Sequence, residues 1–302
     1  MNKKHTLKEW ITAVRPWSFP ASSMPALVAF MFVFFYRQQI DIAPNWLFGI
    51  LSILGAVIYQ ISGNLISDYF DYKRGVDRED TFGSSRLLVN GTFAPKTILR
   101  LGLGFLSLGA LLGVVLVYYT GWPLLVIGVL GFIAALFYYQ FKYIALGDLL
   151  IFLVYGPLIT LGTFYAMTGM VDWKVIWLSI PIGCITVNIL HANNTRDIAH
   201  DRRAGIRTQA MLLGIKGSIA EYILLVAVTY GTLIGMVAAG FLAWPVLGVL
   251  LTLPIAVKNC KLICTASVEH PSRIVDLDVR TAQLQLVFSS LFALLLFISC
   301  RV

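Results

Sequence analysis

The sequence has 302 residues, of which 58% are hydrophobic and 13% charged, and its mean hydropathy is +0.81. Soluble domains carry about 25% charged residues, so this chain lacks the polar side chains that a water-exposed surface of its size requires. The composition excludes a disordered protein, a disulfide scaffold and a soluble nucleic-acid binder, despite the formal net charge of +8. It predicts one polytopic membrane domain over residues 1–302.

Residues 1–15 precede the first long apolar stretch and carry an amphipathic pattern. Apolar side chains recur at i, i+3, i+4 and i+7, the spacing of one helix face: Leu7, Trp10, Ile11 and Val14. A helix of this kind buries one face among lipid headgroups and leaves the other in water. We therefore predict an interfacial N-terminal helix.

Charge-free stretches follow along the rest of the chain, and a helix needs roughly 20 such residues to cross a bilayer. The stretch 101–141 holds two spans, separated at residues 121–123, and 222–257 holds two shorter ones, separated at 240–245. The sequence therefore predicts nine membrane-spanning helices in an all-α fold. The stretches are 16–36, 42–67, 101–141, 149–171, 175–195, 222–257 and 281–300.

The basic residues predict the orientation of these helices. All but three of the 23 Lys and Arg fall in the N-terminal segment or in the loops after even-numbered predicted helices; the exceptions are Arg37, Lys174 and Arg301. Loops rich in Lys and Arg stay in the cytoplasm. The N-terminus and the even-numbered loops are therefore predicted to be cytoplasmic.

The first group of acidic residues lies at the predicted cytoplasmic end of the second helix. If that helix continues past its charge-free stretch, Asn64, Asp68 and Asp71 fall at i, i+4 and i+7 and form one polar stripe. Asp77 follows in the loop. Asp is unfavourable at a helix C-terminus, where the macrodipole favours cations, and neighbouring carboxylates repel each other.

The sixth predicted helix ends in a second stripe of the same kind. Asn193, Asp197 and Asp201 fall at i, i+4 and i+8, and Asn194 lies beside them. Ordinary solvation at a membrane boundary explains one lone Asp better than it explains two such stripes. Mg²⁺ would offset the repulsion, because it prefers oxygen ligands and bridges carboxylates to substrate phosphates.

Basic residues of the same loops complete a predicted diphosphate site: Arg86, Lys142 and Arg207. Metal and basic side chains together stabilise the charge on a departing diphosphate, and a membrane cavity would hold a hydrocarbon tail. The chemistry indicated is ionisation of an allylic diphosphate to a carbocation. Nearby aromatic rings could stabilise that cation: Tyr69, Tyr72, Tyr138, Tyr139 and Tyr143.

The cysteines and histidines show no metal-ligand spacing. Cys260 and Cys264 form a CxxxC pair without a second ligand pair, which argues against zinc. His191 borders the second acidic group and His200 lies inside it. For both histidines we predict packing or solvation.

At these motifs the sequence resembles the UbiA superfamily of intramembrane prenyltransferases. Within it, the chain is most similar to the branch that prenylates 1,4-dihydroxy-2-naphthoate in menaquinone synthesis (the MenA branch). The resemblance runs from Arg15 to the ninth predicted helix. The matching residues are Arg15-Pro16, Asn64-Leu65, Asp68 to Tyr72, Gly75 to Asp77, Gly83, Arg86, Asn90-Gly91, Gly147-Asp148, Asn193 to Asp197, Asp201, Gly205 and Thr208.

The resemblance implies a multi-pass enzyme of the bacterial cytoplasmic membrane, with nine helices around a central cavity. It implies transfer of a polyprenyl group from polyprenyl diphosphate to an aromatic quinone precursor, with Mg²⁺ as cofactor and the aspartate motifs on the cytoplasmic side. The implied Mg²⁺ ligands are Asn64, Asp68, Asp71, Asp77, Asp197 and Asp201, of which Asp68, Asp71, Asp197 and Asp201 are catalytic. The implied diphosphate contacts are Arg86, Lys142, Arg207, Asn64, Asn193 and Asn194.

Two positions depart from the family pattern. Ser67 stands where many members have Asn, and residues 83–86 differ from the usual Gly-Pro-x-Arg. One alternative is the same chemistry with another acceptor, such as 4-hydroxybenzoate, homogentisate or a haem precursor. An alternative of another class is a cation-coupled transporter. A transporter places its carboxylates deep in the membrane, whereas these lie at helix ends beside basic loops.

Overall fold

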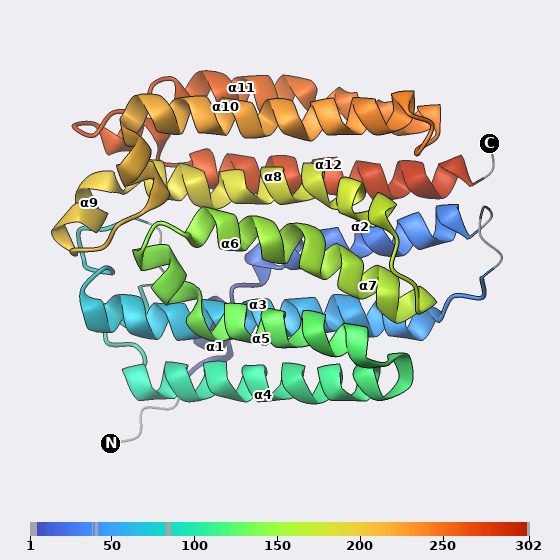
Figure 1. Cartoon of the computed structure of the whole chain (residues 1–302). Coiled ribbons are helices and arrows are strands. Elements are labelled where there is room, and N and C mark those ends of the chain that lie inside the picture. Colours follow the sequence, from blue (N-terminus) through green and yellow to red (C-terminus); the bar gives the residue numbers. More distant parts are fainter. Residues whose placement is uncertain (1–4, 38, 40–41, 83–85, 301–302) are drawn as a thin grey trace.

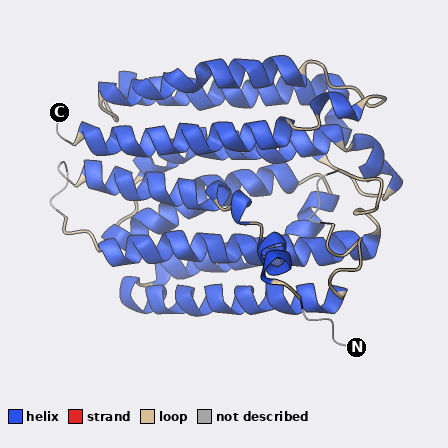
Figure 2. Ribbon diagram, turned by 180° about the vertical axis from the view of Figure 1, so that it is seen from behind, coloured by secondary structure: helices blue, strands red, loops and turns tan. Residues whose placement is uncertain are grey.

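The computed structural model describes residues 5–37, 39, 42–82 and 86–300, and these form helices without a β-strand (Figures 1 and 2). Eight helical segments are long and apolar enough to cross a membrane, and a bent pair, Leu7–Ser18 with Pro20–Tyr36, makes a ninth. The nine predicted helices are confirmed. Apart from the bent pair, the segments are α3 (Trp46–Arg74), α4 (Pro95–Thr120), α5 (Trp122–Tyr143), α6 to α7 (Gly147–Thr168), α8 (Trp173–Arg196), α10 (Gln209–Ala238), η3 to α11 (Trp244–Ile263) and η4 to α12 (Pro271–Ser299).

The two predicted breaks fall where the backbone requires glycine. Gly121 has φ +99° between α4 and α5, and Gly240 has φ +73° after α10. Glycine reaches positive φ without a steric penalty. A proline then follows in the first turn of the next helix, where its missing N–H costs no hydrogen bond.

The N-terminal helix α1 (Leu7–Val14) forms as predicted. Thr6 caps it by accepting from the backbone N–H of Glu9, whose carboxylate accepts in turn from the Thr6 N–H. The ring of Trp10 packs 4.6 Å from that of Phe93. Leu7 is 76% exposed, so one apolar edge of the helix is not covered by the rest of the chain. The interfacial position of the helix stays a prediction.

The helices form two groups joined by α2 (Pro20–Tyr36). In one group, α3 packs against α4 and α5; in the other, α8 packs against α10 and α12 (Figure 1). α2 contacts both α3 and α12. The main hydrophobic core lies in the second group and along α2 and α7. Its largest fully buried side chains include Phe32, Phe164, Ile182, Phe288 and Phe292.

The first group encloses an apolar cavity of about 350 Å³ between α3, α4, α5 and the span α6 to α7. Small residues make the room: a Cβ added at Gly128 or Gly131 would meet no heavy atom within 4 Å. In the span α6 to α7, Pro157 lies in a π-helical turn, Val154–Leu158 (η2), that separates α6 (Gly147–Leu153) from α7 (Ile159–Thr168).

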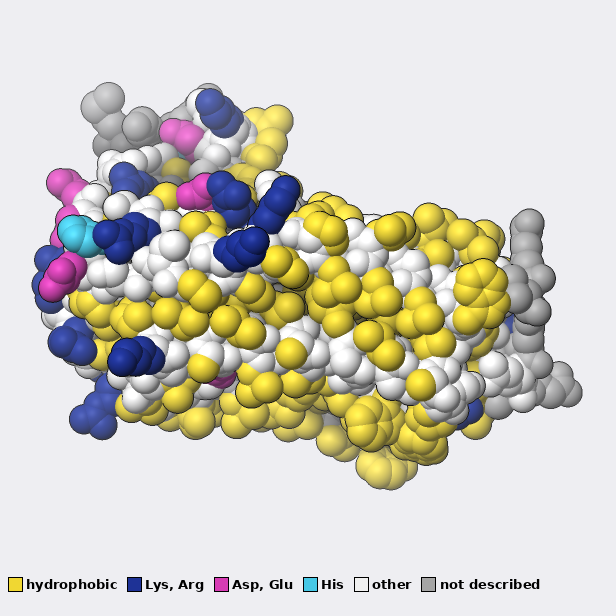
Figure 3. All heavy atoms as spheres, turned by 90° about the horizontal axis from the view of Figure 1, so that it is seen from above, with side chains coloured by type: hydrophobic (Ala, Val, Ile, Leu, Met, Phe, Trp, Pro, Cys, Tyr) yellow, Lys and Arg dark blue, Asp and Glu magenta, His cyan; other side chains and the backbone are white. Residues whose placement is uncertain are grey.

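The molecular surface is divided between apolar and charged parts. Figure 3 shows Lys and Arg gathered toward one end and hydrophobic side chains over much of the remaining face. Many large apolar residues of the spans are exposed, Leu111 and Trp122 among them. Such a surface needs lipid around it, so the chain is a multi-pass membrane protein.

Candidate active site

A polar cavity of about 220 Å³ lies at the end of the bundle that carries α9 (Ile198–Arg203), here called the α9 end (Figure 1). The last turns of α3, α5 and α8 meet there, together with the loop after α3. It brings together both predicted motifs and one of the predicted basic residues: Asn64, Asp68, Asp71, Asp77, Lys142, Asn193, Asn194, Asp197 and Asp201.

The first motif lies on one uninterrupted helix. α3 continues to Arg74, past its charge-free stretch, so Asn64, Asp68 and Asp71 share a face as predicted. The chain then turns at Gly75, which has φ +72°. The backbone N–H groups of Val76 and Asp77 donate to the Asp71 carbonyl at 2.8 and 3.3 Å. This turn returns Asp77 to the cavity.

Asp68 is paired with a residue from far away in the sequence. Nη2 of Arg15 lies 2.8 Å from each carboxylate oxygen of Asp68. Arg15 has φ +56°, a region that non-glycine residues rarely adopt. The short link between α1 and α2 is therefore held in an uncommon conformation at the point where it presents this guanidinium to the cavity.

The carboxylate of Asp71 accepts hydrogen bonds from three side chains. Lys142 Nζ lies 3.1 Å from Oδ2, the Tyr143 hydroxyl donates to Oδ1 at 2.6 Å, and the Ser67 hydroxyl donates to Oδ2 at 3.1 Å. Lys142 belongs to the last turn of α5, whereas the sequence predicted a loop position. Ser67 uses its hydroxyl on Asp71, which gives this departure from the family pattern a role within the motif.

The second motif departs from the predicted helical stripe. α8 ends at Arg196, Asp197 interrupts the helix, and Asp201 lies on the separate helix α9. Arg196 folds back over this junction: its guanidinium donates to Asn193 Oδ1 at 2.7 Å and to both oxygens of Asp197 at 2.8 and 2.9 Å. The prediction of one continuous helical face is wrong, although all its residues reach the cavity.

Arg196 is almost fully buried and joins the motif to α12 (Leu277–Ser299). Its remaining nitrogen lies 3.2 Å from Asp278 Oδ2 and 3.1 Å from the Val275 carbonyl. A buried guanidinium with two carboxylate partners is a structural centre, because removing it would leave both charges uncompensated.

Asp77 and Asp201 are the acidic residues of the cavity without a basic partner. In the described part of the chain neither forms an ion pair, and burial, together with the neighbouring carboxylates, raises the pKa of each to about 7. The desolvation of the charged form is the largest cause in both cases. The cavity thus concentrates more carboxylates than its basic residues balance.

This donor set suits a hard divalent cation. Carboxylate and amide oxygens are the ligands that Mg²⁺ prefers, and here they face one another from α3, α8 and α9. The polar cavity also adjoins the apolar one, because Asn64 and Tyr138 line both. A carboxylate-rich space and a hydrocarbon-lined space therefore lie side by side.

Comparison with known proteins identifies this arrangement. Residues 22–267 match the model of the UbiA prenyltransferase family. The chain belongs to this family and is a prenyltransferase. It is 34% identical to mouse (Mus musculus) UbiA prenyltransferase domain-containing protein 1 over 265 residues, which cover 84% of this chain and 75% of that protein. It spans 63% of the length of the Drosophila melanogaster homolog.

The match to a bacterial relative covers more of that relative's length. The prenyltransferase is 30% identical to 1,4-dihydroxy-2-naphthoate octaprenyltransferase of Bacillus subtilis (strain 168) over 289 residues, which cover 94% of this chain and 91% of that protein. Among solved structures, a UbiA homolog from Aeropyrum pernix K1 has a TM-score of 0.70 at 16% identity, covering 96% of this chain and 99% of that one. A homolog from Archaeoglobus fulgidus, bound to GPP and Mg²⁺, has a TM-score of 0.61 at 13% identity, covering 94% and 99%.

Two predicted diphosphate contacts of the prenyltransferase lie outside the cavity lining. Arg86 is exposed and donates to the Thr81 carbonyl at 2.9 Å. Arg207 is also exposed, and its backbone pairs with Tyr143 and Ala145. Their roles stay predictions. The neighbouring loop positions 83–85, which differ from the family pattern, lie outside the described residues.

Five polar residues of the cavity lining were not predicted as site residues: Arg15, Ser67, Thr81, Arg196 and His200. Arg15 had one sequence signal, the Arg-Pro pair before the first membrane helix. Ser67 and Arg196 lie within the motifs but carried no predicted role, because their contacts depend on how α3, α8 and α12 come together.

Proposed function

We propose that this prenyltransferase transfers a polyprenyl group from polyprenyl diphosphate to 1,4-dihydroxy-2-naphthoate, with Mg²⁺, in menaquinone synthesis. The observation that carries the proposal is that the two cavities adjoin each other. A carboxylate-rich pocket and an apolar pocket meet at Asn64 and Tyr138. A molecule with a charged diphosphate head and a long hydrocarbon tail has the same division.

The apolar pocket supplies the binding site for the tail. Its volume of about 350 Å³ is bounded by aliphatic and aromatic side chains of α3, α4, α5 and α6 to α7. Burying apolar surface contributes about 25 cal/mol per Å², so an extended prenyl chain gains affinity along its whole length. The remote tail then helps to orient the reacting carbon near the carboxylates.

The two aspartate motifs would hold Mg²⁺: Asn64, Asp68, Asp71 and Asp77 from one side, and Asp197 and Asp201 from the other. Bound Mg²⁺ would neutralise the negative charge of the diphosphate and favour its departure. The Archaeoglobus fulgidus homolog bound to GPP and Mg²⁺ supports this assignment by analogy. Lys142 and Arg15, which contact carboxylates of the first motif, are placed to contact diphosphate oxygens.

In the proposed reaction, the allylic C–O bond breaks and the diphosphate departs with the electron pair. The aromatic ring donates an electron pair to the resulting carbocation, a C–C bond forms, and the ring carboxyl leaves as CO₂. Tyr138 lines both cavities, so its ring lies at the junction where the cation would form and could stabilise it.

The acceptor and the location are proposed from the relatives. The Bacillus subtilis relative is named for 1,4-dihydroxy-2-naphthoate, while the animal relatives, at 34% identity, carry no acceptor in their names. Another aromatic acceptor is therefore the second candidate. The basic loops support placement in the bacterial cytoplasmic membrane, with the α9 end toward the cytoplasm. The transporter alternative is overturned by the family membership.

An assay of the purified protein tests the proposal. Labelled prenyl diphosphates are supplied with Mg²⁺ and a panel of aromatic acceptors that includes 1,4-dihydroxy-2-naphthoate. We expect Mg²⁺-dependent product that disappears in both Asp68→Ala and Asp197→Ala. Absence of product with every acceptor from folded protein, or full activity of both variants, would refute the proposal. Product with a different acceptor alone would select the second candidate.

A further inference from the structure

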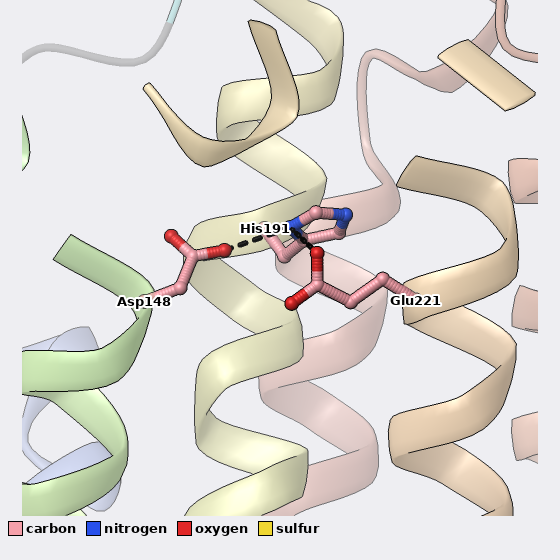
Figure 4. Close-up of side chains that lie close together, drawn as sticks. All are labelled: Asp148, His191 and Glu221. Atoms are coloured by element: carbon pink, nitrogen blue, oxygen red, sulfur yellow. Dashed lines mark hydrogen bonds and ion pairs between the residues drawn. The ribbon is translucent and has the colours of Figure 1, made fainter. Parts of the chain in front are cut away.

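Three polar side chains point toward one another between the helices (Figure 4), and none of the three lines the polar cavity. Asp148 from α6, His191 from α8 and Glu221 from α10 lie on three different membrane helices. His191 is fully buried. Its Nδ1 lies 2.7 Å from Asp148 Oδ2 and 3.5 Å from Glu221 Oε2. Nothing in the proposed reaction uses these residues directly.

The partners of His191 determine which atoms carry protons. Nε2 lies 3.0 Å from the carbonyl oxygen of Ser218. A carbonyl only accepts, so Nε2 carries a proton. The short contact of Nδ1 with Asp148 Oδ2 then requires a second proton, which resides on the ring or on the carboxyl group. With the proton in either place, the other oxygen of Asp148, Oδ1, remains an acceptor.

That remaining oxygen determines how Asn194 is turned. Asn194 Nδ2 donates to Asp148 Oδ1 at 3.0 Å. Because Oδ1 accepts, it must face the amide NH₂, which leaves the amide oxygen of Asn194 for the cavity that this residue lines. The assignment of N and O therefore follows from the network rather than from the shape of the side chain.

Asn193 is turned the other way. Its Oδ1 accepts from Nη2 of Arg196 at 2.7 Å. A guanidinium only donates, so the amide oxygen is engaged and the NH₂ group is left for the cavity. Two adjacent asparagines thus present opposite ends of the same chemical group: Asn194 an acceptor, Asn193 a donor.

We propose that Asp148, His191 and Glu221 are positioning residues that hold the oxygen of Asn194 toward the metal, while Arg196 holds the NH₂ of Asn193 toward the diphosphate. An amide oxygen suits Mg²⁺ or a water bound to it, and an NH₂ group suits a phosphate oxygen. Glu221 supports the cluster through Oε1, which accepts from Gln209. This inference rests on the proposed function and divides the two asparagines between metal and diphosphate.

A transition-metal site is the competing interpretation of the cluster, since the three ligand atoms lie within 4.8 Å of one another. The distances favour hydrogen bonding. Two ligands of one tetrahedral metal, each about 2.0–2.1 Å from it, lie about 3.3 Å apart. Nδ1 and Oδ2 are separated by 2.7 Å, the length of a hydrogen bond.

A double-mutant cycle tests the proposal on the full-length protein. The half-saturating Mg²⁺ concentration is measured in two ways, from turnover and from the thermal shift that Mg²⁺ produces. We expect Asp148→Ala and Asn194→Ala each to raise it about 10-fold, the lower end of outer-shell effects on metal sites. If Asp148 acts through Asn194, the double variant is no worse than Asn194→Ala alone.

Asn193 provides the matched control. Asn193→Ala is expected to raise the KM for the prenyl diphosphate. When it is combined with Asp148→Ala, the fold-changes of the two single variants should multiply, to within about twofold, in each measured parameter, as for independent sites. A general loss of structure would instead move both parameters in all variants.

If Asp148→Ala fails to fold, exchanging the two side chains between positions 148 and 194 provides a second test. Asn194→Asp alone places two carboxylates side by side and should weaken Mg²⁺ binding. In Asp148→Asn/Asn194→Asp, the new amide donates to the new carboxylate, whose second oxygen still faces the cavity. We expect this pair to recover a half-saturating concentration within a few-fold of wild type.

Three results would overturn the proposal. The first is that Asp148→Ala and Asn194→Ala multiply in their effects on the half-saturating Mg²⁺ concentration, and the second is that the exchange variant binds Mg²⁺ more weakly than Asn194→Asp. The third is one equivalent of transition metal in the purified protein that is lost in His191→Ala. Absence of prenyl transfer by the wild type would instead refute the proposed function. The thermal-shift cycle would still report whether Asp148 and Asn194 are coupled.

Discussion

The two aspartate motifs reach one cavity but are held in different ways. The first lies on the continuous helix α3, and its carboxylates pair with cations from elsewhere: Arg15 from before α2, and Lys142 from α5. The second is interrupted at Asp197 and is held by its own neighbour, Arg196, which also reaches Asp278. Among the described residues, Arg15 and Lys142 each form an ion pair with one carboxylate, whereas Arg196 forms ion pairs with two.

This difference separates adaptable contacts from structural ones. The side chains of Arg15 and Lys142 are each 18% exposed, while that of Arg196 is 3% exposed. A partly solvated cation with one partner can shift to an arriving diphosphate at small cost. A buried cation with several partners cannot shift in this way, because each carboxylate that it leaves would lose its ion-pair partner. We therefore expect the first motif to adjust when substrate binds and the second to stay fixed.

Asp71→Asn should have the largest effect on activity. It removes the charge on which Lys142, Tyr143 and Ser67 converge. We expect kcat/KM to fall about 10²–10³-fold or more, as when a preorganised electrostatic group is lost, with little change in Tm. Initial rates of labelled prenyl transfer measure it. The matched control is Asp80→Asn, an exposed residue that pairs with Arg78 and Arg203; equal losses in both variants would contradict the assignment.

Arg196→Met should have the largest effect on stability. The substitution keeps the volume of the side chain but breaks two ion pairs at once and leaves the half-buried Asp197 and Asp278 without their cation, which costs about 3–5 kcal/mol. Arg15→Met is the comparison within the first motif; it breaks one ion pair, with Asp68, so we expect it to lose activity with a clearly smaller fall in Tm than Arg196→Met. Thermal unfolding in detergent distinguishes the two. Similar Tm values for both variants would remove the distinction between the motifs.

The sequence predicted the first motif better than the second, for a physical reason. The first motif depends on helical spacing, and α3 continues through it without interruption, so positions i, i+4 and i+7 point to one side. The second motif depends on Arg196, whose partners lie 82 residues away at Asp278 as well as beside it. No local pattern records that contact. The helix break at Asp197 was therefore missed.

Helix number, and which acidic residues would line one cavity, were also predictable, because charge-free length and paired carboxylates are local properties. The pairing of Arg15 with Asp68 joins positions 53 residues apart, and the cluster of Asp148, His191 and Glu221 joins three helices. A lone histidine in an apolar stretch gives no sign of such partners, so packing or solvation was predicted for His191. Its actual neighbours are visible only once the helices are assembled.

Magnesium binding should depend on pH through the carboxylates that lack a cation. Asp77 and Asp201 have pKa values of about 7, above the value of about 3.9 for Asp in an unfolded chain. The metal-free native state therefore keeps protons that the unfolded chain releases, and it loses stability as pH rises from about 4 to about 7. Mg²⁺ needs ionised ligands, so we expect the half-saturating Mg²⁺ concentration to fall about 10-fold or more from pH 6 to pH 8.

Thermal shifts at fixed Mg²⁺ concentrations across this range measure the effect. The double variant Asp77→Asn/Asp201→Asn removes both titrating groups and should flatten the pH dependence while weakening binding at every pH. A wild-type affinity that is constant from pH 6 to pH 8 would show that the carboxylates are already ionised before Mg²⁺ binds.

Tyr143→Phe is the finest test of the difference between the motifs. The hydroxyl donates to Asp71 at 2.6 Å, but Lys142 and Ser67 remain on the same carboxylate, so we expect a loss of about 1 kcal/mol, or about fivefold in kcat/KM. Tyr139→Phe is the control: its ring stacks on Phe70 at 3.7 Å, and its hydroxyl meets Gln140 at an exposed position. Equal effects of the two variants would mean that the aromatic wall, and not the contact with Asp71, determines the rate.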